Sequence, residues 1–180
     1  MKTITMASTW CEGCSGCHMS FLDMDERLVE LIGKGLVLTA TPITDLKIPP
    51  MGTDLGIIEG AVATDHHMED VKELRHRCKM IVALGDCAVF GGINTMRNYF
   101  TVDELLHRGY VTTESTVNGT PPTSNELGKL LPKVLSVHEV VKVDFFIPGC
   151  PPPANVIYHV LNELVEGRVP RLTQDLLYYD

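Results

Sequence analysis

The sequence has 180 residues, of which 44% are hydrophobic and 21% are charged, and its formal net charge is −8. This length suits a single core, so we expect residues 1–180 to form one domain. The acidic balance excludes the basic surface that nucleic acids and anionic membranes attract. The N-terminus has no recognisable signal peptide, and no apolar run approaches the ~20 residues of a membrane helix. These features predict a cytoplasmic protein without membrane insertion.

Strand and helix patterns alternate along the chain. Short apolar, β-branched runs predict strands, and amphipathic runs predict helices. In chain order we expect a strand at 2–8, a helix at 18–35, a strand at 36–42, a loop at 43–54, a strand at 55–63, a helix at 64–78, a strand at 79–85, a short helix at 102–108, a loop at 109–125, a helix at 127–136, a strand at 140–149 and a helix at 152–167. Ser20 and Asp23 resemble a capping box of the first helix. The order predicts an α/β fold with an open, mostly parallel sheet and helices on both faces.

Five of the six cysteines follow predicted strands. In a reducing compartment, this many thiols indicate metal or redox chemistry more than disulfides. Ligands of open α/β sheets bind at the carboxyl ends of the strands. We therefore expect one edge of the sheet to carry the five sulfurs, which belong to Cys11, Cys14, Cys17, Cys87 and Cys150.

Cys78 differs from the other five cysteines. It ends a predicted helix at the opposite edge of the sheet, at helical spacing from Val71 and Leu74. Free cysteine is a common small core residue, so we expect Cys78 to be buried and structural.

Four thiolates are the usual ligands of a [4Fe-4S] cluster and of a structural zinc ion. A zinc-stabilised binding module would use two close cysteine pairs, whereas Cys87 and Cys150 are single and far apart. This spacing favours a cluster in a redox protein, but it leaves two ligand sets open. One is ferredoxin-like and uses Cys11, Cys14 and Cys17 with Cys150; the other uses one close pair with Cys87 and Cys150.

Three motifs resemble the small subunit of [NiFe] hydrogenases. They are "CSGC" at 14–17, "GDCAVFGG" at 85–92 and "PGCPP" at 148–152, and the stretch "WCEGCSGCHMSFLD" is similar to the cytoplasmic NAD-reducing (bidirectional) type. The resemblance implies a flavodoxin-like fold. It also implies one proximal [4Fe-4S] cluster, with Cys11 outside the ligand set and with no catalytic residue in this chain. The implied ligands are Cys14, Cys17, Cys87 and Cys150.

The resemblance also implies partners. These are a large subunit with the nickel-iron site and a diaphorase with FMN, iron-sulfur centres and the NAD site. Larger small subunits continue into a domain with two further clusters, whereas this sequence ends after its last predicted helix, so we expect one cluster. Small subunits of deazaflavin- or viologen-linked hydrogenases share the motifs. The related complex I subunit has adjacent cysteines in its first motif, where two residues separate Cys14 and Cys17 here.

Several other residues are candidates for a role beside the cluster. Related small subunits usually have Glu directly before the first ligand, where this chain has Gly13 and, one place earlier, Glu12. His18 is a candidate to relay protons or donate to a cluster sulfur, and Glu59 is expected beside the cluster. Flavin binding in this chain is a minority alternative, because the cysteines occupy the loop where a flavin phosphate would lie.

Apolar side chains in three predicted loops indicate interfaces beside the cluster. The loops are 9–17, 43–54 and 88–100, and we expect partner subunits to cover them. Their apolar residues are Trp10, Met51, Phe90, Ile93 and Met96.

Overall fold

The computed structural model describes residues 3–177 and is built on a five-stranded parallel sheet. The strands run in the order β2-β1-β3-β5-β7, and every neighbouring pair is parallel. This is the flavodoxin-like order, in which the first strand lies between the second and the third. The predicted fold class is therefore confirmed. The strands are β1 (Ile4–Trp10), β2 (Leu36–Leu38), β3 (Thr53–Glu59), β5 (Cys78–Leu84) and β7 (Phe145–Ile147).

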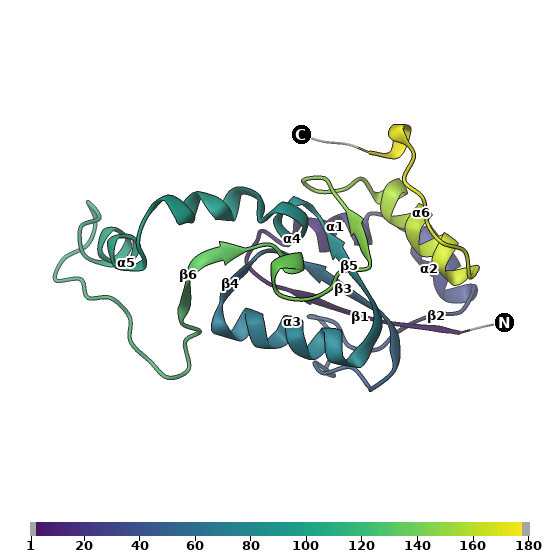
Figure 1. The fold of residues 1–180 in the computed structure, drawn as a ribbon, viewed down its shortest axis with the longest axis horizontal. Coiled ribbons are helices and arrows are strands. Elements are labelled where there is room, and N and C mark those ends of the chain that lie inside the picture. The colour runs from purple at the N-terminus through teal and green to yellow at the C-terminus, as the bar shows by residue number, and fades with distance from the viewer. Residues whose placement is uncertain (1–2, 178–180) are drawn as a thin grey trace.

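Helices cover both faces of this sheet (Figure 1). On one face lie α1 (Gly16–Leu22), α2 (Glu26–Gly33) and α6 (Ala154–Val165). On the other lies α3 (Asp65–Arg77), which begins at the N-cap Thr64 as predicted. Successive strand residues point to opposite faces, so one strand supplies both cores. In β3, for example, Ile57 packs under α1 and α6, and Ile58 packs under α3.

A second, two-stranded sheet lies beside the first. The antiparallel pair consists of β4 (Val62–Thr64) and β6 (Leu130–Leu135). Two predictions were wrong here. The strand expected at 55–63 breaks at Gly60, and the helix expected at 127–136 is the strand β6. Pro132 is tolerated in β6 because that strand pairs on one side only.

The helix predicted at 18–35 is also wrong as a single element. It is interrupted between α1 and α2, where Asp25 has a φ of 50°. Ser20 and Asp23 form no capping box, because Ser20 is buried inside α1 and its hydroxyl donates to the carbonyl of Pro152 at 2.5 Å. The strands expected at 36–42 and 140–149 shrink to the three residues each of β2 and β7.

Short helices fill the region predicted as the loop 88–100. They are α4 (Asp86–Phe90) and the 3-10 helix η1 (Gly92–Tyr99), followed by α5 (Val102–Tyr110), which confirms the short helix expected there. Figure 1 shows α5 and the loop after it standing away from the central sheet. Two more 3-10 turns are η2 (Val137–Glu139) and η3 (Gln174–Leu176). None of the helices in the described part of the chain is long and apolar enough to span a membrane.

Candidate metal centre

The segments that carry the four candidate ligands begin where strands of the central sheet end. Cys14 and Cys17 follow β1, Cys87 follows β5, and Cys150 follows β7. The strands are parallel, so these segments meet at the carboxyl edge of the sheet, as predicted. Cys17 is buried, Cys87 is partly buried, and Cys14 and Cys150 are exposed. The chain therefore encloses one side of the group of thiols and leaves the other side at its surface.

Backbone contacts clamp the segments of Cys87 and Cys150 together. The N–H of Gly85 donates to the carbonyl of Ile147 at 2.8 Å. The N–H of Asp86 donates to the carbonyl of Gly149 at 3.0 Å, and the carboxylate of Asp86 accepts the N–H of Gly149 at 2.7 Å. Asp86 thus fixes the spacing of two candidate ligands, a role that the sequence analysis missed.

Two glycines allow the backbone to pass close to the cysteine sulfurs. Gly85 has φ 83° and ψ 160°, a region that is essentially restricted to glycine, and a Cβ there would overlap the Sγ of Cys17. A Cβ on Gly92 would lie 2.9 Å from the Sγ of Cys87. These glycines form a cradle that any side chain would fill, which fits a bulky inorganic group held by the thiols.

The thiols are close enough to influence one another's ionisation. Burial raises the pKa of Cys17, and negative charge on Glu59 and on the three other thiols raises it further. Burial likewise raises the pKa of Cys87, followed by the charges of Cys150 and Cys14. Positive charge among the sulfurs would favour the thiolate form, and iron held by four thiolates would supply it.

A site for a single metal ion is not formed in the described residues. Within residues 3–177, no group of three or more His, Cys, Asp or Glu side chains has the geometry to hold a metal ion. The case for a metal centre therefore rests on the convergence of the four thiols, the glycine cradle and the chemistry of the donors.

Cys11 lies apart from the four thiols. Its N–H donates to the carbonyl of Glu59 at 2.7 Å, and its side chain packs against the core under α3. Burial, together with the charges of Asp70 and Glu12, raises the pKa of Cys11 to about 12. Cys78 is also separate, because it is 4% exposed and packs against Val71 and Leu74, as predicted.

Glu59 and His18 lie beside Cys17. Glu59 is 3% exposed and accepts the N–H groups of Cys17 at 3.1 Å and His18 at 2.9 Å. Its carboxylate also contacts the Nδ1 of His18, and the Nε2 of His18 lies 3.0 Å from the hydroxyl of Ser8. Both ring nitrogens of His18 are therefore engaged. Its candidate role as a proton relay or as a donor to a cluster sulfur stays a prediction.

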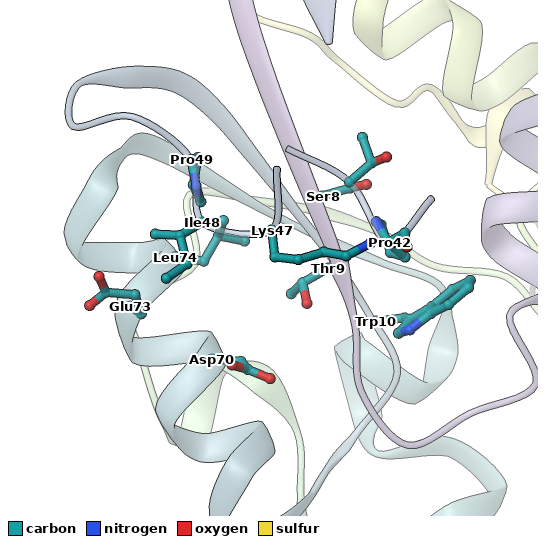
Figure 2. Close-up of a pocket in the computed structure, with 11 residues that line it drawn as sticks. Ser8, Thr9, Trp10, Pro42, Lys47, Ile48, Pro49, Asp70, Glu73 and Leu74 are labelled. Carbon is teal, nitrogen blue, oxygen red and sulfur yellow. Dashed lines mark hydrogen bonds between the residues drawn. The ribbon is translucent and has the colours of Figure 1, made fainter. Parts of the chain in front are cut away.

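A pocket of about 330 Å³ lies between Trp10 at the end of β1 and helix α3 (Figure 2). Lys47 crosses it, and its Nζ donates to the carbonyls of Pro42 and Thr44 at 2.8 and 2.6 Å. Asp70 and Glu73 on α3 add negative charge to the pocket wall. Two carboxylates against the one ammonium of Lys47 make the lining acidic, which disfavours a phosphate-bearing ligand such as a flavin nucleotide.

Most of the apolar residues expected at interfaces are exposed. Trp10, Phe90, Ile93 and Met96 are 43–73% exposed and belong to segments that leave the carboxyl edge. Met51 is also exposed, but its expected position was wrong. The loop 43–54 returns to the amino edge before β3 begins at Thr53, so Met51 lies away from the thiols.

Residues 14–164 match the family of the 20 kDa subunit of NADH-ubiquinone oxidoreductase. The match covers most of the chain, and the chain belongs to this family. Within the family the resemblance to hydrogenase small subunits is confirmed by relatives and by a solved structure that are hydrogenases.

One relative is the delta subunit of the NAD-reducing hydrogenase HoxS of Cupriavidus necator, at 40% identity over 93% of this chain and 81% of the relative. Another belongs to the F420-non-reducing hydrogenase vhu of Methanocaldococcus jannaschii, at 36% identity; the match covers 89% of this chain and about half of the relative (55%). The crystal structure of an NAD+-reducing [NiFe]-hydrogenase in the H2-reduced state matches with a TM-score of 0.95 and 36% identity, over 99% of this chain and 100% of the other.

Proposed function

We propose that the chain is the electron-transfer subunit of a cytoplasmic NAD-reducing [NiFe] hydrogenase, which converts H2 and NAD+ to NADH and H+. Residues 1–180 act as one domain in this proposal. The observation that carries it is the convergence of four thiols from three segments at the carboxyl edge of the sheet. The acceptor follows from two matches that are NAD-reducing hydrogenases and that span most of both chains. The proposed ligands of one [4Fe-4S] cluster are Cys14, Cys17, Cys87 and Cys150.

When bound, the cluster supplies a one-electron centre between the nickel-iron site of the large subunit and a flavin and iron-sulfur diaphorase. The chain's own residues hold and enclose it. Cys17 binds from the buried side, and Cys14 and Cys150 bind from the exposed rim. The open side of the site then faces a partner, which excludes water from it. FMN, NAD and the nickel-iron site belong to the partners, and no catalytic residue lies in this chain.

Single cysteine variants of the whole complex test the ligand set. We expect alanine at any of the four positions to abolish the cluster of this chain, because no water matches the softness of a thiolate. Cys11→Ser is the matched control, and its iron content is expected to stay near that of the parent. The measurements are iron and acid-labile sulfide content, electron paramagnetic resonance and hydrogen-dependent NAD reduction.

Two results would contradict the proposal. If Cys11→Ser loses the cluster while Cys87→Ala keeps it, the ferredoxin-like ligand set is correct. If the parent chain is colourless and contains zinc, it is a zinc-stabilised binding module without a redox role.

A different electron acceptor is the second candidate. It is favoured by the relationship to a chain of an F420-non-reducing hydrogenase. Purification of the native complex separates the two candidates. A diaphorase partner with FMN supports NAD as the acceptor, and its absence supports the second candidate.

A further inference from the structure

Glu59 is the last residue of β3 and lies against the start of the helix that carries Cys17. Both of its carboxylate oxygens accept hydrogen bonds there. Oε1 accepts the N–H of Cys17 at 3.1 Å, and Oε2 accepts the N–H of His18 at 2.9 Å. One side chain therefore serves two successive backbone N–H groups of this helix.

Helix α1 has no other cap for these N–H groups. The first N–H groups of any helix lack partners inside the helix and need an external acceptor. The N-cap residue Ser15 has a φ of 63°, and its hydroxyl makes no capping bond. The acceptor comes instead from Glu59, more than 40 residues away in the chain. Its removal would leave two N–H groups without a partner directly beside a candidate ligand.

The orientation of the Glu59 carboxylate is itself fixed from the neighbouring strand. His18 contacts Oε2 through Nδ1, and its Nε2 lies 3.0 Å from the hydroxyl of Ser8 on β1. Among the described residues, no Lys or Arg forms an ion pair with Glu59. The only groups that balance its negative charge are therefore N–H groups and an imidazole. The remaining negative charge lies directly beside the candidate cluster site.

We propose that Glu59 is a positioning residue that fixes Cys17 and lowers the reduction potential of the cluster. This inference rests on the proposed function. Two effects act in the same direction, because cluster potentials depend on nearby charge and on hydrogen bonds to sulfur. The carboxylate adds negative charge, which favours the oxidised cluster. It also binds two N–H groups that would otherwise be available to sulfur and would raise the potential.

The test uses the whole complex with Glu59→Gln, which preserves the volume of the side chain and removes its charge. The signal of this chain's cluster is identified as the one that Cys87→Ala removes. We expect a redox titration to show a higher midpoint potential. We also expect an iron chelator to remove this cluster about 10-fold faster or more, the lower end of the effect typical of residues that orient metal ligands.

Asp54→Asn is the matched control. Asp54 lies on the same strand, accepts hydrogen bonds from Thr5 and lies at the opposite edge of the sheet. We expect this variant to leave the midpoint potential and the rate of cluster loss unchanged. A shift equal to that of Glu59→Gln would show that any change of charge on β3 has the same effect, and it would overturn the inference.

Glu59→Asp and hydrogen exchange keep the inference testable if Glu59→Gln assembles poorly. Asp retains the charge but is too short to reach both N–H groups, so we expect a potential nearer the parent and faster loss of the cluster. Amide exchange in residues 14–22 should accelerate in both variants, while exchange in residues 26–33 stays constant. Parental exchange and parental potential in the variants would overturn the inference.

The experiment separates this inference from the proposed function. If the parent complex has no signal that Cys87→Ala removes, the proposed function fails. If that signal is present and Glu59→Gln leaves its potential and stability unchanged, only the role of Glu59 fails.

Discussion

Strand β3 carries a carboxylate near each end, and the two are balanced in different ways. Asp54, at the amino edge, binds the Nζ of Lys79 at 2.7 Å and accepts the hydroxyl and N–H of Thr5. Glu59, at the carboxyl edge, is more deeply buried, and its neighbours are N–H groups, a histidine and the thiol of Cys17. At the amino edge, the charge of Asp54 is paired with the ammonium group of Lys79 in the same chain. At the carboxyl edge, the titratable neighbours of the Cys17 thiol are all acidic groups.

The two buried cysteines repeat this difference. Cys78 at the amino edge is 4% exposed, and burial raises its pKa to about 11 while Arg75 opposes the change. Cys17 at the carboxyl edge is 8% exposed, and every charged neighbour adds to the effect of burial on its pKa. Burial alone therefore does not distinguish a ligand from a core residue. The two thiols differ in the charges beside them, which are negative near Cys17 and positive, from Arg75, near Cys78.

The largest effect is expected when alanine variants of these two cysteines are compared. Cys17→Ala should remove the cluster and reduce hydrogen-dependent NAD reduction to background. Cys78→Ala should keep all of the iron and lower the free energy of unfolding by about 1 kcal/mol, the usual cost of a single core change. Iron analysis and urea unfolding measure the two outcomes. Loss of iron from Cys78→Ala would show that the two edges are not functionally distinct.

A smaller effect is expected from alanine at two glycines with nearly equal φ. Gly52 at the amino edge has φ 82° and nothing within 4 Å of an added Cβ. Gly52→Ala should cost only the backbone strain, about 1–2 kcal/mol. Gly85→Ala adds a Cβ that overlaps the Sγ of Cys17, so it should also lower the iron content. The comparison fails if both variants retain iron equally.

The smallest effect concerns the acid dependence of stability. Hydrogen bonding to Lys79 is the main cause that lowers the pKa of Asp54 from 3.8 to about 2. A carboxyl whose pKa is lower in the folded state stabilises the fold above its unfolded pKa and loses that contribution as the pH falls through the folded value. Asp54→Asn should therefore be less stable than the parent at pH 6, and the difference should shrink between about pH 4 and pH 2. Urea unfolding of the metal-free chain at several pH values measures this difference in the free energy of unfolding. A difference that stays constant over this pH range would show that the charge of Asp54 is not its cause.

The overall fold could be predicted because the buried strands have strong local patterns. The strand at Cys78–Leu84 contains an unbroken apolar run from Met80 to Leu84, and α3 has a clear N-cap and apolar face. Local sequence patterns gave wrong predictions where the structure depends on the pairing of strands that are far apart in the sequence. The residues of β6 have the spacing of an amphipathic helix, but they pair with β4, which no nearby residue indicates. The break at Asp25 has no glycine or proline to mark it.

The edge at which the candidate ligands lie could be predicted for a similar reason, since each of their segments follows a strand. Strand position alone placed Cys11 there as well, and only the resemblance left it outside the ligand set. The contacts that arrange the candidate ligands could not be predicted. Asp86 binds Gly149 and Glu59 binds the N–H of Cys17, and both bonds join backbone groups to side chains more than 40 residues away. Backbone N–H groups carry no residue-specific signal, so a carboxylate that serves them looks like any other carboxylate in the sequence.

The origin of the four thiols in three separate segments has a consequence for how the protein matures. Cys14 and Cys17 leave the ribosome well before Cys150 has been synthesised. Synthesis proceeds at about 5–20 residues per second, so the roughly 130 residues between Cys17 and Cys150 take on the order of ten seconds. During that time the first two thiols have no completed site. Iron can be delivered to the full set only after Cys150 has been synthesised, and the early pair must be kept reduced until then.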